Sequence, residues 1–222
     1  MDNIKDDYYY VKRLLRSILI TCRYLDNRSM EDLLSDGYLC DAIENRFTKM
    51  AEDISKLSQN YKKSIPTAAW NAVPAIRNRV CHDYDVVDAT ILYKTIKINL
   101  PEFKDALLNS VKINKMGLYT NPFELIKNKK KTIEMRLNDE KRQKLSIGEL
   151  ILFTNNETKE ELLVEIIDFK KFDSFVELYS KYKKEELGYS PDDIANPDDM
   201  FAYYSKESIN KYGVLAIEIR LY

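Results

Sequence analysis

The single histidine of the chain, His82, lies in a polar stretch whose residue types could carry acid–base chemistry. Arg77 and Asn78 precede it, and Tyr84 follows it. A histidine titrates near neutral pH and can move a proton. An arginine offers a fork of donors to a phosphate whose charge grows in the transition state. These residues fit cleavage of RNA by the ribose 2′-hydroxyl, which needs no metal and leaves a 2′,3′-cyclic phosphate and a 5′-hydroxyl.

A helix that runs to about Tyr84 must position this motif. At about 100° per residue, Val73, Ile76 and Val80 face the core. The flank beside them carries the polar residues of the motif, which can border one groove. Because one histidine cannot readily act as both base and acid, we expect a symmetric dimer that brings two copies of His82 to one cleft. The alternative is a dimer or RNA-binding surface without turnover.

The rest of the first half has helical periodicity. Apolar residues recur at helical spacing over 4–26, over 29–57 with Gly37 as a possible kink, and over 87–108. Pro101 suggests a break or kink near Leu100 in the last of these. About four or five helices with short connections predict an up-down bundle.

Composition limits the classes of function. The chain has 222 residues, with 35 basic and 36 acidic side chains, so any nucleic-acid contact must come from a local patch. Its apolar runs are too short to span a membrane, and its first residues carry no secretion signature. The three cysteines indicate free thiols in a reducing cytosol. With a single histidine they offer no zinc set, so we expect no metal or other cofactor and a cytoplasmic location.

The second half is richer in turns and in strand patterns. Four of the five glycines follow residue 110, which predicts a helical domain over 1–111 and a second domain over 112–222. Short helices are expected at 122–128, 174–182 and 197–204. Strands are expected at 132–137, 150–154, 162–169 and 214–221, and the first of them should be half-buried. The predicted fold class is therefore multidomain, an α bundle followed by a small mixed β-barrel of the α+β type.

One charged strand of this second half could bind a ligand. Thr132, Glu134 and Arg136 share one face of the strand, and Lys131 lies at its mouth. A carboxylate and a guanidinium two residues apart can pair with each other, or read a base and a phosphate. The alternative is an ordinary ion pair beside a solvated run of charges.

The first half resembles the HEPN superfamily, and more narrowly the HepT-like toxins, over about residues 4–110. The residues that carry the resemblance are Trp70, Arg77-Asn78, His82-x-Tyr84 and Val86-Val87-Asp88. The resemblance implies a metal-independent ribonuclease, a homodimer, and Arg77 and His82 as catalytic residues. It also implies that Tyr84 matches a tyrosine adenylylated by an MNT-type nucleotidyltransferase antitoxin. Two departures are Val73-Pro74-Ala75-Ile76, where a glycine-containing stretch is usual, and Cys81, where an aliphatic residue is commoner.

The second half resembles the ASCH domain, a relative of the PUA-like RNA-binding fold, over about residues 114–222. The matching pieces are Pro122-Phe123, 131–139, 144–149, 172–175 and 212–219. The resemblance implies a cleft for RNA or a nucleotide-like ligand. Some small members hydrolyse a modified cytidine with the lysine that aligns with Lys131, but Glu134 replaces the threonine of those amidohydrolases.

Together these patterns predict an endoribonuclease with an appended RNA- or nucleotide-binding domain, acting as a toxin or an antiphage effector. Two alternatives stay open. One is a non-catalytic dimeric module that binds RNA or a nucleotide, and the other is hydrolysis of a modified nucleoside at Lys131.

Overall fold

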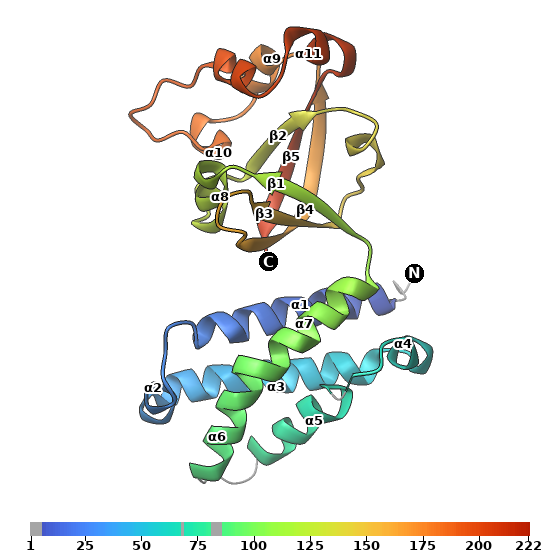
Figure 1. The fold of residues 1–222 in the computed structure, drawn as a ribbon, viewed down its shortest axis with the longest axis vertical. Helices are drawn as coiled ribbons and strands as arrows, with labels where there is room; N and C mark the ends of the chain where they lie inside the picture. Colours follow the sequence, from blue (N-terminus) through green and yellow to red (C-terminus); the bar gives the residue numbers. More distant parts are fainter. Residues whose placement is uncertain (1–5, 68, 81–85) are drawn as a thin grey trace. The chain divides into compact units, whose positions relative to one another are not determined.

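The computed structural model describes residues 6–67, 69–80 and 86–222. The chain divides into two compact units, Met1–Val111 and Lys112–Tyr222 (Figure 1). The first is helical and the second is built on a five-stranded sheet, in agreement with the predicted fold class. No helix among the described residues is both long and apolar enough to cross a lipid bilayer.

The helices of the first unit pack on one another and bury their apolar residues. Its elements in chain order are α1 (Asp7–Tyr24), α2 (Met30–Ser35), α3 (Gly37–Lys56), α4 (Gln59–Ser64), α5 (Ala69–Val80), α6 (Val86–Lys94), the π-helical turn η1 (Thr95–Asn99) and α7 (Leu100–Ser110). Helix α1 packs on α3 and α7, and α3 also packs on α5. Leu15, Ile18, Phe47 and Phe103 are fully buried between them, because each helix turns its apolar stripe inward.

One helix boundary differs from the prediction. The expected single helix over 29–57 is wrong, because the chain breaks at Asp36, whose backbone is extended (φ −108°, ψ 90°). The Asp36 carboxylate caps α3 by accepting the Leu39 N–H at 3.0 Å, so Gly37 begins a helix instead of bending one. Near Leu100, where a break or kink was expected, the chain stays helical but its α-helical hydrogen bonding is interrupted. The Leu100 N–H bonds the Thr95 carbonyl in a π-helical turn, and α7 begins at Leu100 with Pro101 in its first turn.

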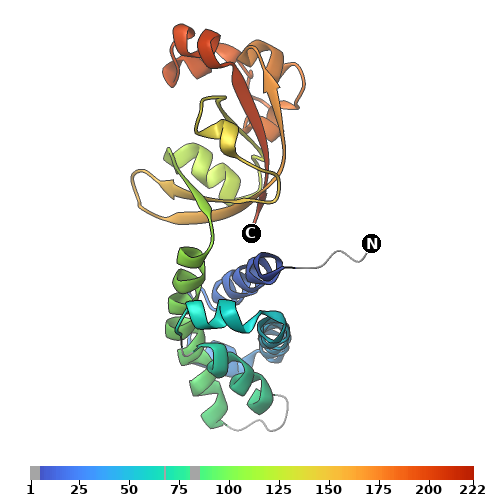
Figure 2. The ribbon, with the colours of Figure 1, turned by 90° about the vertical axis from the view of Figure 1, so that its right-hand side faces the viewer.

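The second unit is a curled sheet with the strand order β1-β3-β4-β5-β2 (Figure 2). Its strands are β1 (Ile113–Leu118), β2 (Ile133–Leu137), β3 (Leu150–Asn155), β4 (Glu161–Phe172) and β5 (Val214–Leu221). Strand β1 pairs parallel with β3, and the other neighbours are antiparallel. Its helices are α8 (Thr120–Lys127), η2 (Arg142–Lys144), α9 (Phe175–Tyr179), α10 (Lys184–Leu187), η3 (Pro197–Ala202) and α11 (Lys206–Tyr212).

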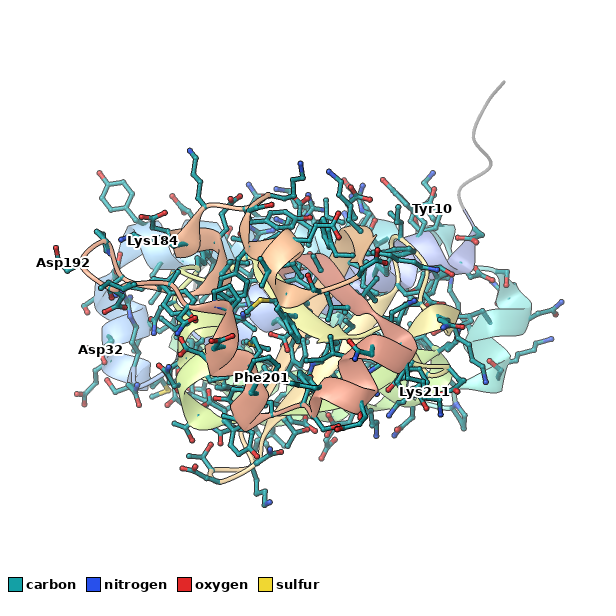
Figure 3. The ribbon with its side chains drawn as sticks, turned by 90° about the horizontal axis from the view of Figure 1, so that it is seen from above. Tyr10, Asp32, Lys184, Asp192, Phe201 and Lys211 are labelled. Atoms are coloured by element: carbon teal, nitrogen blue, oxygen red, sulfur yellow. The ribbon has the colours of Figure 1, made fainter. Side chains whose placement is uncertain are left out.

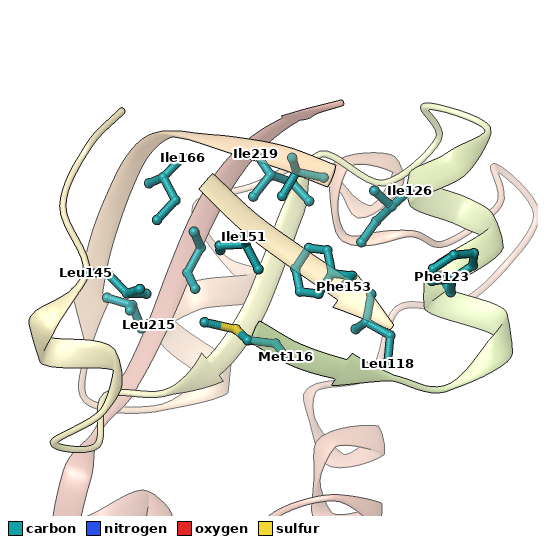
Figure 4. Packing of buried hydrophobic residues seen from close by; sticks show 12 residues of the cluster. Met116, Leu118, Phe123, Ile126, Leu145, Ile151, Phe153, Ile166, Leu215 and Ile219 are labelled. Atoms are coloured by element: carbon teal, nitrogen blue, oxygen red, sulfur yellow. The ribbon is translucent and has the colours of Figure 1, made fainter. Parts of the chain in front are cut away.

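Apolar residues inside the curl hold the sheet together. Figure 4 shows Met116, Ile151, Phe153 and Ile219 pointing into one cluster, with Phe123 of α8 closing it. A second cluster on the other side of β2 joins Ile133, Met135 and Ala216 to the helices that follow β4. The expectation that β2 is half-buried is therefore wrong, because residues 133–135 are covered on both faces.

Strand β1 and helices α10 and α11 were not predicted, and the helix expected over 174–182 is shorter. It ends at Tyr179, and α10 follows after a turn. Gly188 ends α10 with a φ of +104°, a left-handed conformation that favours glycine. This turn places the end of α10 directly against the side chain of Lys131.

Candidate functional site

The first candidate site lies at the C-terminal end of α5. Trp70 fixes the start of this helix, because its indole Nε1 donates to the Ile65 carbonyl at 2.7 Å and its ring meets Phe103 edge to face at 4.9 Å. Val73 and Ile76 are buried, as the helical pattern predicted. These contacts anchor α5 to the core of the helical unit just before its last turn.

Arg77 and Asn78 lie on that last turn and are exposed to solvent. Since Arg77 is exposed, solvent can reach its side chain. His82 and Tyr84 lie outside the described residues, as does the side chain of Val80. The shared groove of Arg77, Asn78, His82 and Tyr84 therefore stays a prediction.

The second candidate site is built around Lys131, immediately before β2. Its side chain is only 5% exposed, and its Nζ donates to the Leu187 carbonyl at 3.0 Å. The Thr132 N–H donates to the neighbouring Glu186 carbonyl, so the last carbonyls of α10 hold both residues. The Glu134 Oε2 lies 3.7 Å from Nζ. Lys131 is thus a buried cation and not part of the solvated lysine run that precedes it.

Glu134 and Arg136 extend this cluster along β2. Arg136 Nε lies 2.7 Å from Glu134 Oε1, so the two side chains form a close ion pair. The Nε–H group itself does not point at that oxygen. Arg136 Nη2 donates to the Gly117 carbonyl of β1 at 2.8 Å. Since β1 and β2 are the two unpaired edges of the sheet, Arg136 bridges the opening of the curl. The structure therefore brings together Lys131, Glu134 and Arg136, with Thr132 beside them and half-buried.

Burial and charge set the protonation of this cluster. Burial lowers the pKa of Lys131 from its ordinary value, and the Glu134 carboxylate offsets only part of this effect. Burial also opposes the charge of Arg136, but Glu134 and Tyr204 together outweigh it and leave the pKa of Arg136 raised. Lys131 therefore loses its proton more readily than Arg136 does. A neutral buried amine can act as a base or a nucleophile, so hydrolysis of a nucleoside at Lys131 stays an open hypothesis.

Tyr204 is a member of this site that the sequence pattern did not reveal. It follows η3, stacks on Phe175 with ring centroids 5.8 Å apart, and interacts electrostatically with Arg136. Burial raises the pKa of Tyr204, while the charge of Arg136 acts to lower it. Gly117 and Leu187 were also missed, because each contributes only a backbone carbonyl, and side-chain patterns do not predict such contacts.

The described residues include no group of three or more histidine, cysteine, aspartate or glutamate side chains placed to hold a metal ion. The cysteines described, Cys22 and Cys40, are free and partly buried. Burial raises the pKa of each thiol, which disfavours the thiolate that a metal or a nucleophilic role would need.

Comparison with known families divides the chain at the same place as the fold. The model of the family described as ribonuclease HepT-like matches residues 14–109. The ASCH domain model matches residues 116–222. The first match covers the helical bundle that carries Arg77 and Asn78, and the second covers the sheet that carries Lys131, Glu134 and Arg136.

Individual relatives are similar to all or part of this chain. A protein of Methanocaldococcus jannaschii, named a gamma-glutamylcyclotransferase and provisionally an RNase, is 24% identical over 83% of this chain and 72% of its own length. The "Probable ribonuclease HepT" of Thermococcus cleftensis is 23% identical over 43% of this chain and 86% of its own length. The crystal structure of hypothetical protein PH0355 is 33% identical, covering 50% of this chain and 100% of its own, with a TM-score of 0.44.

Proposed function

Because this chain joins a domain of the ribonuclease HepT-like family to a domain of the ASCH family, we propose that it is a metal-independent endoribonuclease. The observation that carries the proposal is the match of the HepT-like model to the bundle that presents Arg77 and Asn78 to solvent. An arginine on an exposed helical turn is well suited to hold a phosphate. The histidine that completes the chemistry, His82, follows five residues later in the chain.

The proposed reaction is attack of the ribose 2′-hydroxyl on the adjacent phosphorus, with departure of the 5′-oxygen. Arg77 stabilises the charge that builds on the phosphate, and His82 transfers a proton. Asn78 supports the phosphate or the ribose from the same helical turn. A homodimer supplies a second His82, so that one copy accepts the proton of the 2′-hydroxyl and the other donates to the leaving oxygen.

Incubation of purified protein with RNA tests this proposal. We expect His82→Ala and Arg77→Ala each to lower cleavage by about 100-fold or more. The first variant removes proton transfer, and the second removes stabilisation of the charge that builds in the transition state. The wild-type products should carry 2′,3′-cyclic phosphate and 5′-hydroxyl ends, and cleavage should persist in EDTA.

Asn71→Ala is the matched control, since Asn71 is another exposed polar residue of α5, one turn and a half before Arg77. It should cleave like the wild type. Equal cleavage by wild type and His82→Ala would rule the mechanism out. Saturable RNA binding by a wild type that never cleaves would favour the non-catalytic alternative.

In the same proposal, the ASCH domain binds the RNA through Lys131, Thr132, Glu134 and Arg136 and presents it for cleavage. The protein acts in the cytoplasm as a toxin or antiphage effector. An MNT-type nucleotidyltransferase encoded nearby restrains it by adenylylating Tyr84. The support for these finer points is the family match alone.

A further inference from the structure

Helix α10 covers the buried pair of Lys131 and Glu134. The Lys131 Nζ donates to the Leu187 carbonyl at 3.0 Å, and the Thr132 N–H donates to the Glu186 carbonyl at 3.0 Å. The Leu187 carbonyl thus occupies the position beside Nζ that a ligand of Lys131 would need. Since the side chains of Lys131 and Glu134 are each only 5% exposed, a ligand can contact them only after a covering segment has moved.

Of the elements around Lys131, α10 can move with the least loss of packing. Strand β2 is paired with β5 through residues 133–137, and residues 133–135 are covered on both faces. Helix α8 buries Phe123 and Ile126 in the cluster inside the curl. Helix α10 is a single turn of four residues that buries one side chain, Leu187. Segments with so few buried contacts open at the lowest cost in free energy.

The loop that follows α10 is attached to the helix itself. Lys184 Nζ donates to the Asp193 carbonyl at 2.9 Å and also to the Pro191 carbonyl. Asp192 lies at the outer edge of this loop and is exposed (Figure 3). Because Lys184 joins the helix to the loop and solvent lies on the outer side, residues 183–193 can move as one body.

Gly188 and Tyr189 hold this segment in its closed position. The Tyr189 hydroxyl donates to Asp199 Oδ2 at 2.7 Å and lies 3.1 Å from the Tyr179 hydroxyl. Gly188 has a φ of +104°, and a Cβ added there would lie 3.3 Å from Lys131 Cδ. The segment therefore needs glycine at this position to lie closely on Lys131.

We propose that residues 183–193 form a lid over Lys131, closed in this structure, which must open before a ligand contacts Lys131 or Glu134. Opening exchanges the Leu187 carbonyl at Nζ for water or for a ligand, so a ligand that binds this amine holds the lid open. The inference goes beyond the proposed function, because it applies to any ligand of these two residues.

Acetylation of lysine side chains by an amine-reactive ester tests the lid in the full chain without a ligand. Brief reaction of the folded protein, followed by digestion and tandem mass spectrometry, gives the rate at each lysine. Gly188→Ala should raise the rate at Lys131 by about 5- to 30-fold, because alanine at a positive φ strains the closed position and raises the open fraction. Lys130, the exposed neighbour, is the internal reference and should react equally in every variant.

A control and a second variant separate the lid from the strain of the substitution. Gly37→Ala is the matched control, since a Cβ at Gly37 would meet no atom within 4 Å, and it should leave the rate at Lys131 unchanged. Tyr189→Phe removes the hydroxyl contacts with Asp199 and Tyr179 but adds no backbone strain, and it should also raise the rate at Lys131. An unchanged Lys131 rate in either Gly188→Ala or Tyr189→Phe would overturn the proposal.

Hydrogen exchange measured by NMR separates opening of the lid from unfolding of the sheet unit. In Gly188→Ala, the Thr132 amide should exchange faster than in the wild type, because it loses the Glu186 carbonyl when the lid opens. The amides of β5 should keep their protection. Faster exchange across β5 in step with Thr132 would contradict a lid, because Lys131 would then be reached by unfolding of the sheet. Since no RNA is present, failure of the proposed ribonuclease activity would not affect this result.

Discussion

At the scale of single residues, Glu134 is the counter-charge of two buried cations. Its carboxylate lies 2.7 Å from Arg136 Nε and 3.7 Å from Lys131 Nζ, and the side chains of Lys131 and Glu134 are each 5% exposed. Removing one partner of a buried ion pair leaves charge without compensation, which costs far more than losing a surface pair. The stability of the sheet unit should therefore depend on this one carboxylate.

Glu134→Gln should lower the free energy of unfolding by about 3–5 kcal/mol, because two cations would remain buried without their anion. Urea unfolding followed by far-ultraviolet circular dichroism measures the loss. Glu160→Gln is the matched control, since Glu160 pairs with Lys127 at 2.8 Å with both side chains 43% exposed. An exposed pair of this kind contributes about 0–1 kcal/mol.

The pH dependence of that loss gives a second readout. The pKa of Lys131 is lower in the folded chain than its ordinary value of 10.5. Between these two values the unfolded chain binds more protons, so the unfolding free energy contributed by Lys131 rises with pH. The deficit of Glu134→Gln should shrink as Lys131 becomes neutral in the folded state. A loss no larger than that of Glu160→Gln, or one that grows with pH, would contradict this assignment.

At the scale of secondary structure, Asp36 decides where two helices meet. Its carboxylate accepts the Leu39 N–H at 3.0 Å and also lies 3.3 Å from Arg28 Nη1. The ion pair is largely exposed and should contribute little, whereas an N-cap typically contributes about 1 kcal/mol. Asp36→Ala should therefore destabilise the helical unit by about that amount.

Asp36→Asn separates the cap from the charge, because asparagine caps a helix equally well but cannot pair with Arg28. It should unfold nearly like the wild type. Trp70 is the single tryptophan of the chain and packs edge to face on the buried Phe103 of the helical unit, so its fluorescence during urea unfolding reports this unit. Equal losses for Asp36→Ala and Asp36→Asn would show that the ion pair matters more than the cap.

Strong periodicity made many elements predictable from sequence. The apolar stripe of α1 and the alternation of β5 each depend on their own residues, so local patterns sufficed. The break at Asp36 was missed because the apolar spacing continues on both sides of it. Strand β1 was missed because Ile113–Leu118 contains asparagine, lysine and glycine, and its order comes from pairing with the distant β3.

The candidate sites divide in the same way. The pairing of Glu134 with Arg136 follows from their spacing on one strand, and the sequence offered it as one reading. The approach of the Lys131 side chain to Glu134 was not predicted, because Lys131 precedes β2. Tyr204, Gly117 and Leu187 reach the site only because the sheet curls and the helices after β4 cover β2. Contacts of this kind join residues far apart in the chain, and no local pattern encodes them.

At the scale of the whole molecule, the charge distribution constrains how RNA can be held. The net charge of −1 gives no general attraction for a polyanion. In the proposed function, binding must then depend on local contacts, for which the exposed Arg77 and the buried Lys131 cluster are the candidates. In the proposed mechanism, a second subunit supplies the second proton carrier that a chain with one histidine lacks.

A dimer that mixes one wild-type subunit with one His82→Ala subunit tests this arrangement directly. Two different affinity tags on co-expressed chains allow the mixed dimer to be purified by successive steps. If one cleft needs both histidines as base and acid, the mixed dimer should cleave RNA far below the level of about half expected for two independent sites. A doubly tagged wild-type dimer, purified in the same way, is the control for the tags. Recovery of about half the control activity would mean that each His82 works alone, and failure of the second tag to retain any of the first chain would rule out the dimer itself.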